Sequence, residues 1–267
     1  MMEAVITAAD DIERVNGGRS AALVDSFFIR EEFLWIANAI SPGEHGAVPG
    51  DVEIIRSELS RMRWGLKPHQ SLTFRLLDLR SDDETALSGR HNGTPEPNPE
   101  LGLHGARRII ADVRYQEAVC ELLNDPLLNG ITFSIPFFND ETEVAAVFDA
   151  LRVTDPRRWG VFVETPASVF QLPRILDTGV SVINVGTKDL VQFMLAADRN
   201  NQSVAQYYDT RHPSVMDALT KVVQACAGYE VVVRVYALAA DLDYYRSHLP
   251  DDTRFTMCAH ELTQLVS

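Results

Sequence analysis

The sequence predicts a single (β/α)8 TIM barrel, a fold of the α/β class, over residues 1–267. Short apolar runs rich in β-branched residues alternate with segments that have helical spacing. Near-continuous apolar runs are typical of parallel strands that are covered on both faces. Alternation of strand and helix predicts a parallel sheet with right-handed connections. Eight such runs in 267 residues suit a closed barrel better than an open sheet.

The predicted strands are spread along the whole chain. They are the runs 3–7, 21–29, 72–79, 131–138, 159–164, 180–186, 230–237 and 254–258. Helical spacing is clearest in the segments 99–124, 140–152 and 212–228. The last of these closes on Gly228, a residue that suits a helix C-cap.

One segment, 80–100, has no regular pattern and is rich in Gly, Pro, Asp and Asn. It is interpreted as a long active-site loop that follows the third strand, because structureless loops of this size are usually functional or mobile. A linker between two domains is the alternative. That alternative fails because neither side would have a complete core.

Composition and charge exclude several partners. The formal net charge of −14 repels nucleic acid and anionic membranes, so neither is an expected partner. Cys120, Cys226 and Cys258 are far apart, which predicts neither a disulfide framework nor a zinc site. The N-terminus carries acids where a signal peptide carries bases, and no apolar run is long enough to span a membrane. A cytoplasmic location is therefore expected.

Charged residues gather at the C-terminal ends of the predicted strands, where barrel enzymes place their reactive groups. Glu164 ends the fifth strand, and Asp189 follows the sixth. Two hard carboxylates suit Mg²⁺, which takes its remaining oxygens from water and substrate. Arg30, Arg75 and Arg199 suit a phosphate or carboxylate, which arginine can bind bidentately. These residues together predict a site for a small, multiply charged phosphorylated acid that is bound through a metal.

Each of these residues also has a structural interpretation. Thr165 could be a helix N-cap with Pro166 at the first helical position, and Glu164 could then favour the positive helix end. Asp189 could cap the next helix in the same way. Each arginine could be a paired or snorkelling surface side chain. The combination at barrel-strand ends is what favours the functional interpretation.

Several stretches resemble the PEP-binding barrel of the PEP-utilising enzymes, the family of pyruvate phosphate dikinase, phosphoenolpyruvate synthase and enzyme I of the phosphotransferase system. In the second half they are VETPASV (163–169), NVGTKDLVQFMLAADRNN (184–201) and YYDTRHPSVMDAL (207–219). In the first half, FFIREEFLW (27–35), FRLLDL (74–79) and NPELGLHGARR (98–108) look like three family motifs. Those motifs are Leu-x-Arg-Thr-Glu-Phe, Val-Arg-Leu-Leu-Asp and Asn-Pro-x-Leu-Gly-x-Arg-Gly-x-Arg, and the resemblance covers nearly the whole chain.

The resemblance implies a function and a set of roles. Glu164 and Asp189 fall on the family's Mg²⁺ ligands, and Arg30, Arg75 and Arg199 fall on arginines that hold the phosphate and enolate of PEP. The implied activity is that of a Mg²⁺-dependent, kinase-like phosphotransferase that acts on PEP or pyruvate through a metal-stabilised enolate. No segment corresponds to the family's phosphohistidine or nucleotide-binding domains, so phosphoryl exchange would use a separate phosphocarrier protein, or the substrate would be phosphorylated directly. A homodimer is expected by analogy.

The catalytic cysteine of the family motif Met-Cys-Gly-Glu-Leu-Ala-Gly-Asp falls on Val235, which cannot deliver a proton to C3 of the enolate. Tyr236 beside it is one candidate acid, although strand alternation could turn it away from the barrel axis. Lys188 replaces the Asn of Gly-Thr-Asn-Asp-Leu; it could act as acid or base, or simply pair with an acid. Cys258 at the end of the eighth strand is interpreted as a buried structural thiol.

Two further departures lie in the first half of the chain. His104 replaces the arginine of the Leu-Gly-x-Arg motif and could take over part of its hydrogen bonding, or could simply lie on a helix face. The sequence RSDDE replaces the family's acid- and glycine-rich turn after Asp78. Three functions therefore stay open: the phosphotransferase, a metal-dependent pyruvate aldolase-type lyase, and a catalytically degenerate PEP-binding subunit or sensor. Retention of all three arginines favours phosphate binding.

Overall fold

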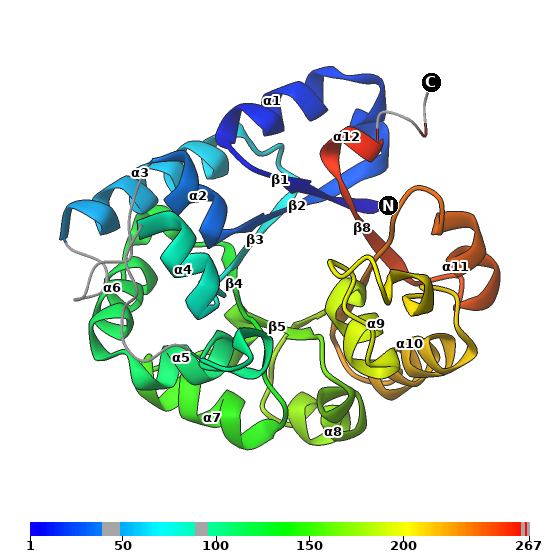
Figure 1. Cartoon of the computed structure of the whole chain (residues 1–267). Coiled ribbons are helices and arrows are strands. Elements are labelled where there is room, and N and C mark those ends of the chain that lie inside the picture. The colour runs from blue at the N-terminus through cyan, green and yellow to red at the C-terminus, as the bar shows by residue number, and fades with distance from the viewer. Residues whose placement is uncertain (39–48, 89–95, 263–264, 266–267) are drawn as a thin grey trace.

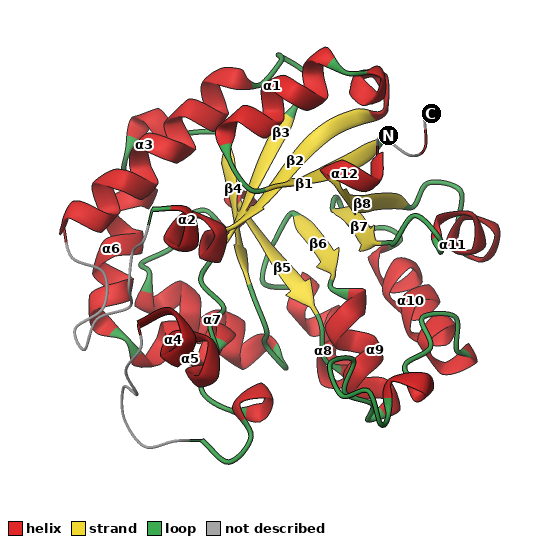
Figure 2. Cartoon of the chain, turned by 45° about the horizontal axis from the view of Figure 1, so that its top comes forward, coloured by secondary structure: helices red, strands yellow, loops and turns green. Residues whose placement is uncertain are grey.

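Eight parallel strands close into a barrel in the computed structural model of this chain, and helices surround it (Figure 1). The structure describes residues 1–38, 49–88, 96–262 and 265. The strands follow their order in the sequence, and β8 pairs with β1 to close the ring. Figure 2 shows the same ring of strands, tilted, inside its layer of helices. The predicted (β/α)8 barrel is confirmed.

The strands overlap the eight predicted runs. They are β1 (Met2–Ile6), β2 (Val24–Arg30), β3 (Ser71–Arg75), β4 (Ile131–Ile135), β5 (Trp159–Val163), β6 (Val182–Val185), β7 (Val232–Tyr236) and β8 (Arg254–Cys258). The third and fourth runs were predicted longer than the strands that form, because their last residues are apolar but belong to the loops that follow.

The helices separate the strands and cover the outside of the barrel. They are α1 (Ala9–Gly17), α2 (Glu31–Ala37), α3 (Pro49–Gly65), α4 (Ser81–Ser88), α5 (Gly105–Ala111), α6 (Val113–Leu123), α7 (Glu141–Ala150), α8 (Pro166–Leu176), α9 (Thr187–Leu195), α10 (Pro213–Cys226), α11 (Leu242–His248) and α12 (Ala259–Leu262). Short 3-10 helices are η1 (Arg19–Leu23), η2 (Pro99–Leu101), η3 (Pro126–Leu128), η4 (Pro156–Arg158) and η5 (Ala205–Tyr207).

The predicted helical segment 99–124 is not one helix. Asp112 interrupts it with an extended backbone, and its carboxylate accepts a hydrogen bond from the Tyr115 amide as the N-cap of α6. The predicted segment 212–228 forms α10, and Gly228 follows its end with a φ of +93°. A left-handed backbone just past a helix favours glycine, so the predicted stop signal is confirmed.

The expectation of an irregular loop over 80–100 is wrong for its first half. Residues Ser81–Ser88 form α4, which has three acidic residues in its first turn, where the helix dipole favours negative charge. The 3-10 helix η2 occupies Pro99–Leu101. The part of the predicted loop over 89–95 lies outside the described residues.

The apolar core fills the layer between the strands and the helices, whereas the inside of the barrel holds many polar side chains together with Phe28 and Phe162. In β3, Leu72 and Phe74 belong to this core, while Arg75 lines a cavity at the barrel mouth. Inside the barrel, Glu3 accepts hydrogen bonds from Ser26 Oγ at 2.9 Å and from Thr256 Oγ1 at 2.8 Å. Strand alternation thus supplies one apolar face and one polar face. In the described part of the chain, no helix has the length and apolarity needed to cross a membrane.

Candidate active site

Two adjoining cavities lie at the C-terminal ends of the strands. An inner cavity of about 130 Å³ and an outer cavity of about 370 Å³ share Arg30, Phe33, Arg75 and Asp189. All eight side chains that the sequence singled out line one cavity or both: Arg30, Arg75, His104, Glu164, Lys188, Asp189, Arg199 and Tyr236. The fold therefore gathers residues that are up to 206 positions apart around one mouth, between Arg30 and Tyr236.

Arg75, at the end of β3, is the hub of the site. Its Nη2 lies 2.7 Å from Glu32 Oε1, and its Nη1 lies 3.5 Å from Asp78 Oδ2 and 3.7 Å from Glu164 Oε2. Burial opposes the charge, but the three carboxylates together raise the pKa of Arg75. Its Nε has no hydrogen-bond partner among the described residues. Arg75 is therefore a fixed cation with one donor still available to a ligand.

Glu164 follows β5 and is buried, with 2% of its surface exposed. Burial raises the pKa of this carboxyl well above its usual range; Arg75 opposes the shift, and the charges of Asp189 and Asp78 add to it. Gly186 makes room for the side chain, because a Cβ at that position would lie 2.4 Å from Glu164 Oε2. Thr165 is the N-cap of α8, and its Oγ1 accepts from the Ser168 amide at 3.1 Å. Glu164 itself accepts from the Phe137 amide at 3.3 Å and is left facing the cavity.

Asp189 lies in the first turn of α9, whose N-cap is Gly186, so Asp189 is not the helix cap that the structural interpretation allowed. Its Oδ1 lies 2.9 Å from Arg199 Nη1, although the alignment is not that of a hydrogen bond. The Arg199 amide also donates to Gln192 Oε1 at 3.4 Å, which ties the segment after α9 back to the helix. The acid and the arginine thus face the cavities as a pair.

A metal site would have to be built from few protein ligands. No group of three or more His, Cys, Asp or Glu side chains in the described parts of the chain is arranged to hold a metal ion. Glu164 and Asp189 line the same inner cavity, and Mg²⁺ commonly takes only one or two carboxylates together with water and substrate oxygens. A cation there would also favour the ionised form of Glu164, whose pKa is raised. The donor set therefore fits Mg²⁺ whose coordination a substrate completes.

His104 is not an exposed helix-face histidine, since only 3% of its surface is exposed. Its Nδ1 lies 2.8 Å from Asp78 Oδ1, and its Nε2 lies 3.0 Å from the Glu100 carbonyl oxygen. Burial lowers the pKa of the ring, but the Asp78 carboxylate and the Glu100 oxygens raise it by more. The net shift of the His104 pKa is therefore upward. The Phe137 ring packs against the His104 ring in a tilted arrangement, with 4.0 Å between their centroids. His104 is therefore held in place between two oxygen atoms that favour its protonated form.

On β7, Tyr236 faces the inside of the barrel and Val235 faces the outside, which differs from the expectation for Tyr236. Tyr236 lines the inner cavity, and its hydroxyl lies 3.4 Å from Cys258 Sγ. Val235 is fully buried in the apolar core and does not line the cavity. The possibility that Tyr236 points away from the axis is thus wrong, because alternation along β7 places Val235 on the outer face. The interpretation of Cys258 as a buried structural thiol is wrong as well, since it is half-buried and lines the cavity.

Lys188 is exposed at the start of α9, and it also lines the inner cavity. Its Nζ lies 4.8 Å from the centre of the Tyr236 ring, a cation–π distance. Its carbonyl oxygen accepts from the Tyr208 hydroxyl at 3.0 Å. Arg30 also lines the inner cavity, and its guanidinium lies 4.2 Å from the centre of the Phe33 ring. Burial and the neighbouring Arg75 lower the pKa of Arg30.

Residues that sequence reasoning did not single out also shape the site. Glu32 accepts from Arg75 and, at 3.0 Å, from the Asp78 amide, so it positions both ends of the β3 loop. Arg234 and Asn184 line the inner cavity from β7 and β6. The signal for these two was their polarity within otherwise apolar strands, which is unusual for a buried strand.

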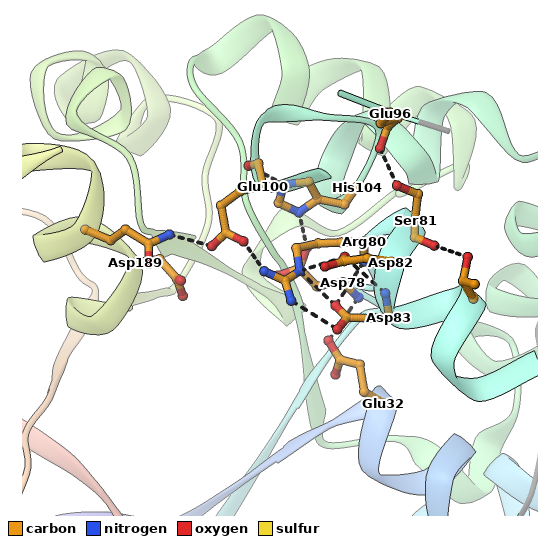
Figure 3. A network of polar contacts seen from close by, with 12 residues as sticks. Glu32, Asp78, Arg80, Ser81, Asp82, Asp83, Glu96, Glu100, His104 and Asp189 are labelled. Carbon is orange, nitrogen blue, oxygen red and sulfur yellow. Dashed lines mark hydrogen bonds and ion pairs between the residues drawn. The ribbon is translucent and has the colours of Figure 1, made fainter. Parts of the chain in front are cut away.

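The segment around α4 and η2 forms a polar rim over the outer cavity, and Figure 3 shows Arg80 among its carboxylates. Arg80 Nε lies 2.9 Å from Asp83 Oδ2, and Arg80 also pairs with Glu100. Glu100 accepts in turn from Gln192 Nε2 at 2.6 Å. These contacts join the segment to α9 and place its charges beside His104.

Residues 140–241 match the family model described as "PEP-utilising enzyme, PEP-binding domain". This match includes Glu164, Lys188, Asp189, Arg199 and Tyr236. This part of the chain is therefore similar to the PEP-binding domain of PEP-utilising enzymes. The match agrees with the resemblance read from the second half of the sequence.

Named relatives in the PEP-utilising family are much longer than this chain. A probable phosphoenolpyruvate synthase of Archaeoglobus fulgidus is 28% identical over 194 residues, which are 70% of this chain and 26% of that protein. A phosphoenolpyruvate-dependent phosphotransferase system protein of Salmonella typhimurium is 40% identical over 178 residues, 61% of this chain and 23% of that protein. The chain thus spans about a quarter of the length of these relatives.

Solved structures show the same fold at low sequence identity. An HpcH/HpaI aldolase/citrate lyase family protein from Burkholderia cenocepacia superposes with a TM-score of 0.55 and 16% identity, over 99% of this chain and 89% of that one. The malate synthase of Haloferax volcanii gives a TM-score of 0.56 and 12% identity, over 98% and 72%. At such identities the likeness concerns the barrel alone.

Proposed function

We propose that this barrel is a Mg²⁺-dependent, PEP- or pyruvate-binding phosphotransferase that acts through a metal-stabilised enolate. The observation that carries the proposal is the convergence of three arginines and two carboxylates on two adjoining cavities. Arg30, Arg75 and Asp189 are shared by both cavities, Glu164 lines the inner one and Arg199 the outer one. This arrangement supports a ligand that carries a phosphate and a metal-binding acid group.

The local charge supports an anionic substrate in spite of the acidic chain. Four cationic side chains line the inner cavity against three carboxylates, whereas the whole chain carries a net charge of −14. Bound Mg²⁺ would add positive charge to this set. A small trianion such as PEP would then be matched electrostatically inside the cavity and repelled elsewhere on the surface.

In this proposal the chain's own residues bind and orient the substrate and protonate its enolate. Glu164 and Asp189 would hold Mg²⁺, which would supply Lewis-acid stabilisation of negative charge on the substrate oxygens. Arg30, Arg75 and Arg199 neutralise the phosphoryl group that is transferred. Tyr236 keeps its proton, because burial and the contact with Cys258 raise the pKa of its phenol. The Tyr236 hydroxyl, which lines the inner cavity, would then be the proton donor to the enolate.

The remaining parts of the proposal concern partners and the rim. The outer cavity would admit the phosphoryl-carrying group of a separate phosphocarrier protein, and a homodimer stays a prediction. Residues 80–100 would act as the active-site segment, since Arg80, Asp83 and Glu100 line the outer cavity. Lys188 and His104 would add charge at the mouth, His104 in place of an arginine.

A pyruvate aldolase-type lyase and a binding-only subunit are the alternatives. Both were motivated by the absence of a cysteine at Val235. Because Val235 faces the apolar core while Tyr236 and Cys258 line the inner cavity, a hydroxyl and a thiol group are still present at the site. This observation favours protonation of an enolate over the other two outcomes.

The first test is calorimetric titration of the chain with PEP and with oxalate, a planar mimic of the pyruvate enolate, with and without Mg²⁺. We expect Mg²⁺-dependent binding of both, and loss of oxalate binding in Glu164→Gln and in Asp189→Asn. Glu141→Gln, which removes a carboxylate on α7 outside both cavities, should bind as the wild type does. Absence of binding with and without metal would sink the proposal.

A second measurement separates enolate chemistry from binding. Pyruvate incubated in heavy water with the chain and Mg²⁺ should exchange its C3 protons, as followed by proton NMR. Binding without exchange would indicate the binding-only subunit.

A further inference from the structure

Arg234 lies deep in the inner cavity with part of its guanidinium unused. It is on β7, two residues before Tyr236, and only 5% of its surface is exposed. Its Nε lies 3.4 Å from Glu3 Oε1. Its Nη1 is buried and has no hydrogen-bond partner within the described part of the chain. A buried cationic nitrogen without an acceptor is costly, which calls for a ligand or a functional reason.

Asn184 on β6 faces the same cavity and is paired with Arg234 in the strand register. Its amide nitrogen donates to Ser134 Oγ at 3.3 Å, whereas its Oδ1 is buried and finds no donor among the residues described. A free donor and a free acceptor therefore line the cavity on adjacent strands, and they are not bonded to each other. The inner end of the cavity is polar and incomplete.

A purely structural role for Arg234 would be to neutralise Glu3. Glu3 already accepts hydrogen bonds from Ser26 at 2.9 Å and from Thr256 at 2.8 Å, and Arg234 reaches it only through Nε. Neutralisation of Glu3 therefore explains one edge of the guanidinium and leaves the buried Nη1 without an acceptor among the described residues. The second edge is free for another anionic oxygen.

We propose that Arg234 binds a carboxylate of the substrate at the inner end of the cavity, with Asn184 beside it. This inference rests on the proposed function, which places a phosphorylated or phosphate-accepting acid at the same mouth. The bulkier phosphate belongs among Arg30, Arg75 and Arg199 near the outer cavity of about 370 Å³. The inner cavity of about 130 Å³ is walled by Phe28 and Phe162, and a flat carboxylate suits this space and a guanidinium edge.

The carboxylate can come from two places on the ligand. It is either the carboxylate that pyruvate and PEP carry at C1, or an additional carboxylate attached to C3, as in a four-carbon oxo acid. In the second case the chain would select dicarboxylates over pyruvate. Both sources share one recognition chemistry, and ligands that differ in their carboxylates distinguish them.

The test is calorimetric titration, in Mg²⁺, of pyruvate, oxaloacetate and inorganic phosphate into the wild type and the double variant Glu3→Gln/Arg234→Met. The double variant removes the cation without stranding a buried carboxylate. Loss of a charged hydrogen bond should weaken carboxylate binding about 10- to 100-fold, and phosphate binding should change less than about twofold. Weakening of both pyruvate and oxaloacetate assigns the C1 carboxylate, whereas weakening of oxaloacetate alone assigns the additional one.

Controls keep the result specific. Arg254 lies opposite Arg234 in the strand register, its side chain is 44% exposed, and it forms an ion pair with Asp25 at 3.1 Å. The Arg254→Met variant should therefore bind every ligand as the wild type does. If the double variant does not fold by circular dichroism, Arg234→Lys keeps a cation near Glu3 and should still weaken carboxylate binding. Equal affinities in wild type and folded variants overturn the inference. Failure of the wild type to bind any ligand overturns the proposed function itself.

Discussion

At the scale of single residues, the site is a set of charges whose protonation states are dictated by their neighbours. His104 shows this most directly, because both of its ring nitrogens face acceptors, Asp78 Oδ1 and the Glu100 carbonyl. A neutral imidazole has only one N–H and could satisfy only one of them. The buried ring therefore carries both protons and supplies a positive charge where the family motif has arginine.

This residue gives the first prediction in terms of pKa. His104 should titrate above its ordinary value of 6.5, since Asp78 and Glu100 outweigh burial. Asp78→Asn should lower the pKa of His104, while Asp82→Asn on the exposed rim should leave it unchanged. Proton NMR of the histidine ring signals between pH 5 and 9 measures both. A His104 signal that titrates at or below 6.5 would contradict the assignment.

At the scale of elements, the ends of neighbouring strands must approach closely for the carboxylates to meet. Glu164 follows β5 and Gly186 follows β6. The Glu164 side chain packs against Gly186. The φ of Gly186 is −79°, so glycine is required there for space and not for backbone conformation. Any side chain on this turn would push Glu164 from its position.

The second prediction tests this contact. In Gly186→Ala the new Cβ would lie 2.4 Å from Glu164 Oε2 and 2.8 Å from its Cδ. Glu164 would have to move to relieve this clash. The variant should therefore lose about 1–3 kcal/mol in the free energy of unfolding and should bind oxalate much more weakly. Urea denaturation and calorimetry measure the two effects. Gly17→Ala, whose Cβ would meet nothing within 4 Å, is the matched control. An alanine variant at 186 that binds oxalate normally would show that Glu164 does not need this position.

At the scale of the whole molecule, buried acids couple stability to pH. Glu31 on α2 joins three segments, since it accepts from Trp35 on α2, from the Leu77 amide after β3 and from the Tyr115 hydroxyl on α6. Burial raises the pKa of Glu31 to about 7, even though these hydrogen bonds lower it. The pKa values of Glu164 and His104 are raised as well.

The third prediction follows from the sign of these shifts. A raised pKa means that the folded state binds the proton more tightly, so the stabilisation is complete at low pH and is lost as pH rises through the folded value. The free energy of unfolding should therefore fall between pH 5 and pH 8, by up to about 1.4 kcal/mol per pH unit for each group. Urea denaturation across this range measures the slope. Glu31→Gln should flatten it, and an unchanged slope would contradict the role given to Glu31.

Much of the whole-molecule organisation could be predicted from the sequence, because it depends on local pattern. The alternation of apolar runs with helical segments specified the barrel, and each of the eight runs overlaps a strand. Helix boundaries inside 99–124 and the helix α4 were missed, since a capping Asp and a short polar helix leave weak signals in composition. The eight candidate site residues were found from motifs at and after the strand ends, and all eight line the two cavities, whereas Val235 lies in the core.

By itself the sequence determined the fold class, the order of the strands and the residues at the barrel mouth, because these follow from periodicity and motif. Only the tertiary structure decided which way β7 faces, since the phase of alternation depends on register with β6 and β8. That phase turned Val235 into the core and Tyr236 into the cavity. It also placed the unpaired nitrogen of Arg234 beside Asn184, because closing the barrel brings distant residues into one buried space where hydrogen-bond partners must be shared.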